Sequence, residues 1–242
     1  MLGIVDIHCH ILPKVDDGSG SVEETMHMLE TAYEEGVRTI VATPHYHPGR
    51  GYANQGVVLE RLKEIQELVE MHYTGLRIYR GNEVVYHDSI VEDLDQNICY
   101  TMNETDYVLV EFHPSHTFDY IRKGAAKVLQ GGYIPIIAHV ERYMALLKKP
   151  DYVKQLVEMG CLIQINAGSV MGNMGLKTKG FCKKLLKKGW VHFIATDAHK
   201  QSGSRTMAIE QCAKYIERKY GSDYATQLLV DNPEMMLQGM DI

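Results

Sequence analysis

Two pairs of metal-ligand side chains lie near opposite ends of the sequence. His8 and His10 are two residues apart, and Asp197 and His199 repeat that spacing. On an extended segment, residues two apart point to the same side, so each pair can bind one ion. Ligation would be by nitrogen and oxygen without cysteine, which suits Mn, Fe, Zn or Mg and disfavours a closed structural zinc site.

Similar side chains follow most of the apolar runs of the chain. We predict seven strands from these runs, at residues 4–8, 37–43, 76–81, 107–112, 134–138, 162–166 and 192–196. Near-continuous apolar runs of this length are typical of parallel strands covered on both faces. A ligand-type side chain stands at the carboxyl end of six of the seven, and the candidate ligands are His8, His10, Asp17, His45, Glu83, Glu111, His139, Asp197 and His199.

Helical patterns alternate with these strands, and the alternation predicts one parallel sheet. Ser21 and Glu24 form a capping box for the first helix, and Gly36 ends it. The carboxyl ends of the strands can all meet on one face only if the sheet closes into a barrel. We therefore predict an α/β fold, a (β/α)7 TIM-like barrel of parallel strands with outer helices, as a single domain over residues 1–242.

Four carboxylates and five histidines exceed what a single ion needs, so the sequence predicts two or three ions bridged by carboxylates. A single histidine at a strand end more often makes a structural hydrogen bond than a metal bond. Independent accidents would not align with six separate strand ends, and the joint pattern therefore favours a polynuclear site. We expect structural roles for His27, His72 and His87. Roles at the same face stay open for His47, His113 and His116.

Two arginines are placed to act beside these ligands. Arg142 follows His139 by three residues, and Arg205 lies just beyond His199. Guanidinium groups that face a metal cluster are suited to hold a tetrahedral oxyanion such as phosphate. Taken alone, either arginine could equally form an ion pair with a surface carboxylate.

Composition excludes several other classes of function. The net charge of −6 argues against binding nucleic acid or an anionic membrane through bulk charge. No apolar run is long enough to span a membrane, and the first residues lack the basic start of a signal peptide. Five scattered cysteines without a C-x-x-C pair indicate a reduced, cytoplasmic protein. Cys212 and Arg218 have the spacing of thiolate phosphatases, but they lie in a predicted helix instead of the loop that such chemistry needs.

Together the motifs resemble the PHP (polymerase and histidinol phosphatase) superfamily. Within it, the chain is similar to the bacterial manganese-dependent protein-tyrosine phosphatases of capsular and exopolysaccharide loci. The resemblance covers essentially the whole chain and rests on residues 6–13, 15–18, 36–40, 43–45, 81–83, 110–112, 138–142, 197–199 and 231–233.

This resemblance implies a distorted barrel, the PHP fold, with three metal ions, Mn²⁺ in the family and Fe, Zn or Mg as alternatives. The implied ligands of the first ion are His8, His10, Glu83 and Asp197. Those of the second are Glu83, Glu111 and His139. Those of the third are Asp17, His45 and His199, with Asp16 as the alternative to Asp17.

The resemblance also implies roles in catalysis and a partner. Arg142 and Arg205 would hold the phosphate, and a metal-activated water would attack phosphorus. Asp17 and His199 are the candidates to protonate the leaving phenolate. The implied substrate is the phosphotyrosine tail of a tyrosine autokinase that controls polysaccharide export. Self-association into a homo-oligomer stays open.

Three other functions compete with this interpretation. A PHP phosphatase could act on a small molecule such as histidinol phosphate. A metal-dependent amidohydrolase also begins with two histidines on a barrel strand, but the paired arginines favour phosphorus over a carbon electrophile. A degenerate module that only binds partners is disfavoured, because every proposed ligand is present.

Overall fold

Parallel strands form the centre of the molecule. The computed structural model describes residues 3–242. The described strands are β1 (Ile4–Cys9), β2 (Val37–Ala42), β3 (His45–Tyr46), β4 (Arg77–Arg80), β5 (Glu83–Val85), β6 (Tyr107–Glu111), β7 (Ile134–Ile137), β8 (Leu162–Asn166) and β9 (Phe193–Ala195). They pair in two groups, in the orders β1-β2-β4 and β3-β5-β6-β7-β8-β9, and every pairing is parallel.

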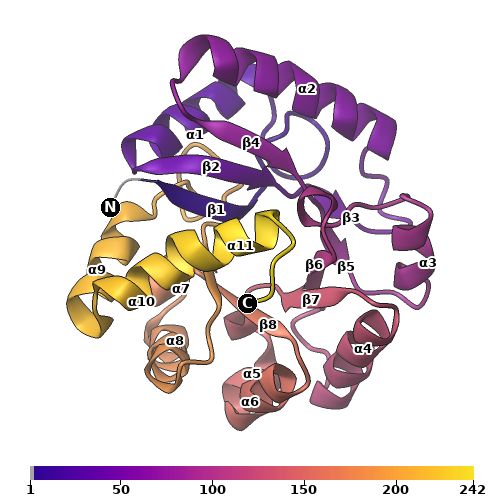
Figure 1. The fold of residues 1–242 in the computed structure, drawn as a ribbon, viewed down its shortest axis with the longest axis vertical. Helices are drawn as coiled ribbons and strands as arrows, with labels where there is room; N and C mark the ends of the chain where they lie inside the picture. Colours follow the sequence, from indigo (N-terminus) through magenta and orange to yellow (C-terminus); the bar gives the residue numbers. More distant parts are fainter. Residues whose placement is uncertain (1–2) are drawn as a thin grey trace.

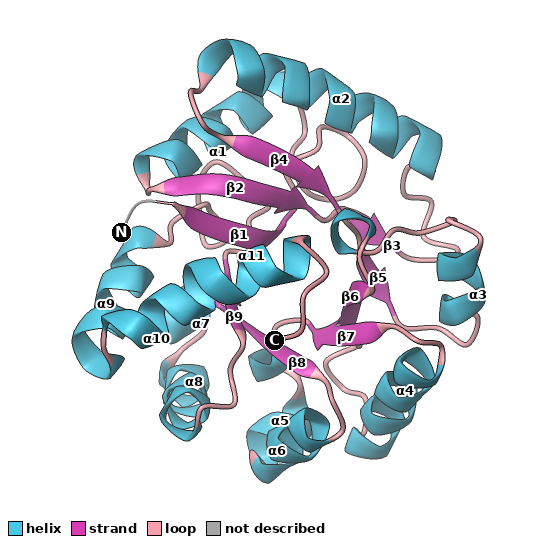
Figure 2. Ribbon diagram, in the orientation of Figure 1, coloured by secondary structure: helices cyan, strands magenta, loops and turns pink. Residues whose placement is uncertain are grey.

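The two groups join into one curled sheet with helices outside (Figures 1 and 2). On one side, β3 and β5 continue the lines of β2 and β4 after short breaks, and the Gly81 amide donates to Ala42 O at 3.0 Å within that gap. On the other side, the ends of β1 and β9 meet where the His10 amide donates to Ala198 O at 2.8 Å. The predicted parallel α/β barrel is therefore confirmed. Two of the seven predicted strands, 37–43 and 76–81, end at these breaks, and the short strands β3 and β5 beyond them were not predicted. The breaks are where the sheet departs from a regular barrel.

Helices cover the outside of this sheet. They are α1 (Val22–Glu34), α2 (Gln55–His72), α3 (Ile90–Asp95), α4 (Phe118–Gln130), α5 (Met144–Lys148), α6 (Asp151–Glu158), α7 (Ala167–Met171), α8 (Leu176–Lys188), α9 (Glu210–Tyr220), α10 (Ser222–Thr226) and α11 (Asn232–Leu237). Single turns also occur at η1 (Met102–Glu104), η2 (Val140–Arg142) and η3 (Gln227–Asp231). No helix among residues 3–242 has the length and apolar character needed to cross a membrane.

The first helix begins and ends where the sequence predicts. The Ser21 hydroxyl accepts the Glu24 amide at 3.1 Å, and the Glu24 carboxylate accepts the Gly20 amide at 2.8 Å. Gly36 follows the helix with φ of +89°, a conformation that glycine adopts without steric cost. The short helices α3, α5, α7 and α10 were not predicted, because helices of five or six residues are too short to show a clear apolar period.

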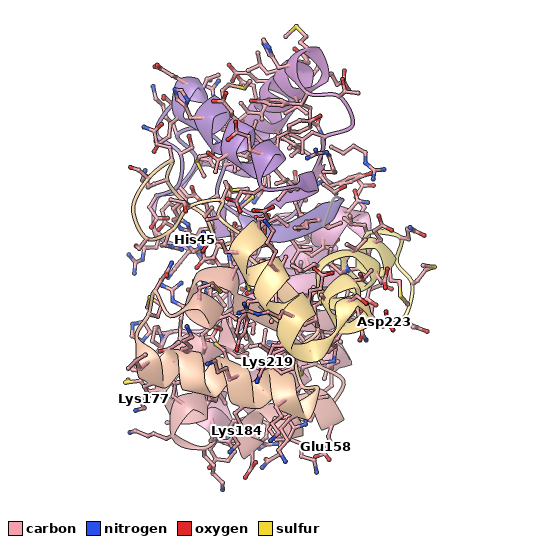
Figure 3. All side chains as sticks on the ribbon, turned by 90° about the vertical axis from the view of Figure 1, so that its left-hand side faces the viewer. His45, Glu158, Lys177, Lys184, Lys219 and Asp223 are labelled. Carbon is pink, nitrogen blue, oxygen red and sulfur yellow. The ribbon has the colours of Figure 1, made fainter. Side chains whose placement is uncertain are left out.

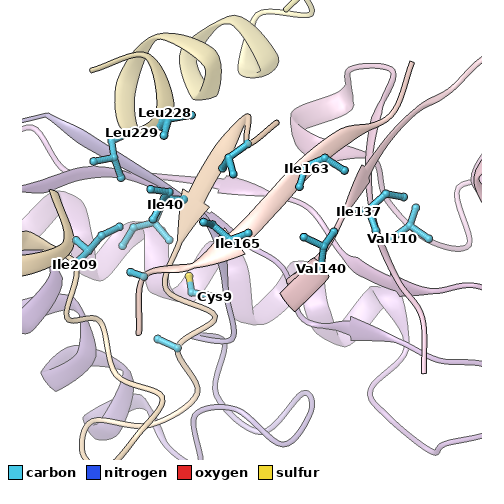
Figure 4. Close-up of a cluster of buried hydrophobic side chains, with 14 of the residues drawn as sticks. Cys9, Ile40, Val110, Ile137, Val140, Ile163, Ile165, Ile209, Leu228 and Leu229 are labelled. Carbon is cyan, nitrogen blue, oxygen red and sulfur yellow. The ribbon is translucent and has the colours of Figure 1, made fainter. Parts of the chain in front are cut away.

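Strand residues alternate between two apolar clusters. Leu109 of β6 and Leu162 of β8 point into the barrel, where Met236 of α11 packs against them. Their neighbours Val110 and Ile163 point outward into the layer between strands and helices, which Figure 4 shows together with Leu228 and Leu229 of η3. This alternation has period two, as the pleat of a strand requires.

The two ends of the barrel differ. Helix α11 lies across one end, where Tyr107 donates its hydroxyl to Met240 O at 2.6 Å. His45 lies at the opposite end, and Figure 3 shows it on the far side of the molecule from Asp223 of α10. The lysines of α8 other than Lys179 are exposed, as Lys177 and Lys184 in Figure 3 illustrate. These lysines therefore form a solvated helix face.

His192, immediately before β9, makes stability depend on pH. Its Nδ1 accepts the Ile163 amide at 3.0 Å, and burial lowers the pKa of this histidine to about 4. The unfolded chain, with a histidine pKa near ~6.5, binds the proton first as the pH falls, so stability is full above that value and falls toward pH 4. Between pH 7 and pH 5, His192 should lower the free energy of unfolding of the wild type by roughly 2 kcal/mol. We predict that His192→Gln abolishes this part of the decrease.

Urea unfolding of the wild type and the variant at both pH values measures this difference. His27→Gln is the matched control, because His27 is 54% exposed on α1. If the difference in free energy of unfolding between wild type and His192→Gln were the same at pH 5 and pH 7, His192 would not be the cause of the pH dependence.

Candidate metal centre

All nine predicted ligand side chains meet at the end of the barrel opposite α11. β1 supplies His8, and His10 follows it; β3, β5 and β6 supply His45, Glu83 and Glu111; His139 follows β7; Asp197 and His199 follow β9; and Asp17 lies in the loop after β1. The carboxyl ends of the parallel strands bring these positions together although they span most of the chain. Eight of them form three overlapping groups, and His139 lies against the two glutamates of the second group.

The first group is fully buried and comprises His8, His10, Glu83 and Asp197. Its ligand atoms lie within 4.8 Å of one another. The Nε2 atoms of His8 and His10 are 3.3 Å apart, and each is 3.2 Å from Oε2 of Glu83. This group is the one that the sequence resemblance implies for the first ion.

The second group lies around the two glutamates. His139 Nε2 is 2.8 Å from Oε1 of Glu83 and 3.5 Å from Oε1 of Glu111. His45 Nδ1 approaches the other oxygens of the same carboxylates, at 3.1 Å and 3.8 Å. The structure therefore adds His45 to the set of Glu83, Glu111 and His139.

The third group lies nearest the surface. Oδ1 of Asp17 is 3.5 Å from His45 Nε2 and 3.6 Å from His199 Nε2. His10 belongs to this group as well, with its ring centroid 3.8 Å from that of His199. Asp17, with a side chain 56% exposed, is the open side of this group.

Several buried atoms of these groups have no hydrogen-bond partner. They are Oε2 of Glu83, Nδ1 of His45, Nδ1 of His139 and Nε2 of His199. Buried polar atoms are rarely left without a partner. Nitrogen and oxygen atoms of these residues lie about 3 Å apart and face one another without a hydrogen bond. This spacing is expected for atoms that share a cation, each at a ligand distance near ~2.1 Å. The residues therefore fit bound divalent cations.

Charge in the groups is balanced by neighbouring side chains. Burial alone would lower the pKa of His10, but the Asp16 carboxylate outweighs burial and raises it to about 10. Burial would raise the pKa of Glu83, yet the charges of His8 and His45 hold it well below its usual value. Burial lowers the pKa of His139 and of His199, so both are neutral at pH 7, the form that binds metal.

Asp16 has a different place from Asp17. Oδ2 of Asp16 bonds Nδ1 of His10 at 2.7 Å and accepts the His45 amide at 2.9 Å. It therefore orients His10, whose Nε2 faces the first group, as carboxylates commonly orient metal-binding histidines. Asp17, not Asp16, has its carboxylate among the ligand atoms of the third group.

Two further positioning residues were missed in the sequence. Oε1 of Gln164 contacts Nδ1 of His8 at 3.3 Å and accepts the His139 amide at 2.6 Å. Asp6 accepts the Thr196 amide at 3.0 Å, which joins β1 to β9 beneath the site. Asp6 continues the spacing of His8 and His10 by two residues, and that period was a usable signal. Gln164 lies in an otherwise apolar strand, and its contacts with His8 and His139 depend on how the barrel closes, so no signal in the sequence marks it.

The backbone is constrained at both ends of the site. His139 and Asp197 have φ of +30° and +54°, in the left-handed region that side chains rarely adopt. Such conformations cluster at functional sites, where the surroundings hold them. Gly18 packs against the chain at His10, and a Cβ on Gly18 would lie 2.3 Å from His10 O.

Both predicted arginines reach the site through Asp197. Arg142 Nη1 donates to Oδ2 of Asp197 at 3.0 Å, and Arg205 Nη2 donates to Oδ1 at 2.6 Å. Both arginines, with Asp17, His45 and Glu111, also line an open cleft of about 510 Å³. Burial and the charge of Glu83 raise the pKa of Glu111 to about 8.

The remaining histidines lie outside the three groups. His47, His113 and His116 line the same cleft. His87 bonds Asp93 at 2.9 Å beneath α3, and His27 lies 3.7 Å from Glu30 on α1. Cys212 is buried in α9, as predicted, so it has no part in the site.

Comparison with known proteins gives consistent matches. The family model described as "Capsular polysaccharide synthesis, CpsB/CapC" matches residues 4–238. Tyrosine-protein phosphatase YwqE of Bacillus subtilis is 32% identical over 239 residues, covering 99% of this chain and 93% of that protein. Tyrosine-protein phosphatase CpsB of Streptococcus pneumoniae is 35% identical over 240 residues, covering 97% of this chain and 98% of that protein.

Solved structures agree with this match. A structure from work on YwqE of Bacillus subtilis and CpsB of Streptococcus pneumoniae, described as unique metal-dependent tyrosine phosphatases, superposes with a TM-score of 0.92. It is 32% identical and covers 99% of this chain and 96% of that one. Histidinol phosphate phosphatase of Lactococcus lactis, at 18% identity, covers 91% of this chain and 95% of that one with a TM-score of 0.62, and shares the fold.

The close approach of Gly18 to His10 yields a test of how the groups are held. Gly18→Ala forces the added methyl against His10 O and His10 Cβ, so the backbone at His10 must move. We predict that this variant binds fewer metal ions than the wild type, by at least about one ion per chain, as measured by elemental analysis after gel filtration.

Gly20→Ala is the matched control in the same loop, because its Cβ meets only the flexible Glu24 side chain at 3.3 Å. Wild-type metal content in Gly18→Ala would show that the His10 backbone position does not matter for metal binding.

Proposed function

Because the chain belongs to the capsular polysaccharide synthesis family CpsB/CapC, we propose that it is a metal-dependent protein-tyrosine phosphatase of capsule or exopolysaccharide synthesis. One observation carries the proposal beyond the family match. The three ligand groups, made of nitrogen and oxygen donors only, lie beside a cleft that Arg142 and Arg205 line. Substrates are accordingly proteins that carry phosphotyrosine, with the chain acting as a single domain.

The proposed cations are two or three Mn²⁺ ions, with Fe, Zn or Mg as alternatives. Their proposed ligands are the three groups described above, with Glu83 shared between the first and second groups and His45 between the second and third. Imidazole and carboxylate donors suit these metals. Buried donors without hydrogen-bond partners support this assignment.

When bound, the cations would polarise the phosphate and supply hydroxide near neutral pH. The side chains of the protein do the rest of the work. Arg142 and Arg205 bind phosphate oxygens and offset the charge that develops during transfer. Both guanidinium groups already point at one carboxylate, that of Asp197, so little reorganisation is needed to place them over the same substrate group.

The leaving group needs limited help. A tyrosine phenolate has a pKa near ~10, so it requires less protonation than an alkoxide. We propose Asp17, at the open side of the third group, and His199 beside it as the groups that hold a water molecule, and that water passes its proton to the phenolate oxygen. A tyrosine autokinase is the proposed physiological substrate. The cytoplasm is the proposed compartment, supported by five free, buried cysteines.

Activity of the purified protein tests the proposed function. We predict that it hydrolyses a phosphotyrosine peptide with Mn²⁺ and loses turnover with a chelator, and that kcat/KM for histidinol phosphate is at least about tenfold lower. The discrimination is expected because a substrate that leaves part of the cleft empty forfeits binding energy. Higher kcat/KM for histidinol phosphate, or turnover that survives metal removal, would contradict the proposal.

Arg142 gives a separate test, of phosphate binding. We predict that Arg142→Ala lowers kcat/KM for p-nitrophenyl phosphate about 100-fold, weakens inhibition by inorganic phosphate and keeps the full metal content. Arg122→Ala is the control, an arginine on α4 that pairs with Asp119 away from the cleft. Loss of metal from Arg142→Ala would show that this arginine supports the cations instead of the phosphate.

A further inference from the structure

The cleft beside the metal centre is larger than a phosphate group requires. Its volume of about 510 Å³ falls within the range of sites that hold whole ligands. Of the proposed ligands, Asp17, His45 and Glu111 line it, together with Arg142 and Arg205. The rest of the cleft must therefore receive the part of the substrate that carries the phosphate.

One wall of this remaining space is apolar or neutral. It includes Tyr86, Phe112, Pro114 and His116. Nδ1 of His116 accepts the His113 amide at 3.2 Å, which fixes the ring. Burial and the neighbouring His113 lower the pKa of His116, so this ring is uncharged at pH 7. The wall therefore suits an aromatic ring and offers no fixed charge to a peptide.

Arg50, on the exposed loop between β3 and α2, forms a lip of the same cleft. Three arginines line the cleft, and two of them donate to Asp197. Among residues 3–242, Arg50 forms no ion pair with a carboxylate. It is exposed at the lip, between β3 and α2. Asp17 and Glu111 also line the cleft, but they are proposed ligands of the cations. Arg50 is therefore the charged side chain of the cleft that neither binds a cation nor pairs with Asp197.

The loop around Arg50 holds it at this lip. Gly49 and Gly51 have φ of +81° and +72°, so the chain turns sharply on both sides of the arginine. The Arg50 amide donates to His47 O at 3.2 Å. The Ala53 amide donates to Val15 O at 2.9 Å and ties the loop to the segment that carries Asp17. Arg50 is therefore presented at a defined place next to the site.

We propose that Arg50 is a specificity residue that binds a carboxylate side chain flanking the phosphotyrosine of the substrate protein. This inference rests on the proposed function. A guanidinium group binds carboxylates through two parallel hydrogen bonds. At an exposed lip such a contact changes affinity by a few-fold and weakens with salt. The preferred substrate is thus a phosphotyrosine with acidic neighbours.

Two synthetic phosphotyrosine peptides of equal length test this, one with Glu and one with Lys on both sides of the tyrosine. With the metal-loaded wild type at low salt, we expect kcat/KM to favour the Glu peptide by about threefold or more, mainly through KM. Arg50→Gln should bring the ratio near one, and Arg50→Glu should reverse it. High salt should reduce the wild-type preference.

Two controls separate the proposal from other outcomes. Arg122→Glu, a charge reversal at a partly exposed position of α4, should keep the preference. p-Nitrophenyl phosphate, which has no flanking residues, should be hydrolysed alike by wild type and Arg50→Gln. A preference unchanged in Arg50→Glu would overturn the proposal. So would an equal fall for p-nitrophenyl phosphate, which would mean that Arg50 binds the phosphate itself.

Failure of the proposed function has a different signature. In that case the wild type would hydrolyse neither peptide, and the inference about Arg50 would fall with it. If the inference alone is wrong, the wild type hydrolyses both peptides, and Arg50→Glu leaves the ratio of their kcat/KM values unchanged.

Discussion

The carboxylate of Glu83 is the interaction on which the rest of the site depends. It is fully buried, and its two oxygens approach four imidazoles, those of His8, His10, His45 and His139. A buried charge is costly unless opposite charge surrounds it closely. Glu83 is therefore stable only while histidines or cations compensate it, and every strand that delivers a compensating group must end at the same place.

The barrel meets that requirement through its breaks as much as its regular strands. Asn82 lies between β4 and β5, and its side chain donates to Pro44 O at 2.8 Å, in the matching break between β2 and β3. His45 and Glu83 begin the two strand segments after these breaks and are partners in the ladder. The left-handed backbone at His139 and Asp197 turns two more ligands inward. The distortions of the barrel are thus what place these ligands at the site.

Sequence could predict the parts whose signal is local. Spacing by two residues, apolar runs and ligand types after strand ends were enough to predict the parallel α/β barrel and to place the nine candidate ligands and both arginines at one end of it. The sharing of ligands between groups could not be predicted. Whether His10 and His45 each contact one ligand group or two depends on the curvature of the barrel. Gln164 and Asp6 were missed for a related reason. Their partners, His139 and Thr196, come from other strands, and Asp6 and Thr196 are 190 positions apart.

The central claim is that nine side chains from residues 8 to 199 form one cage of donors around several cations. Anomalous diffraction at the manganese edge from crystals grown with Mn²⁺ tests it directly. The account predicts two or three strong peaks, each at about 2.2 Å from nitrogen or oxygen atoms of the three groups, with Glu83 next to at least two of them. Peaks elsewhere, or none beside Glu83, would contradict it.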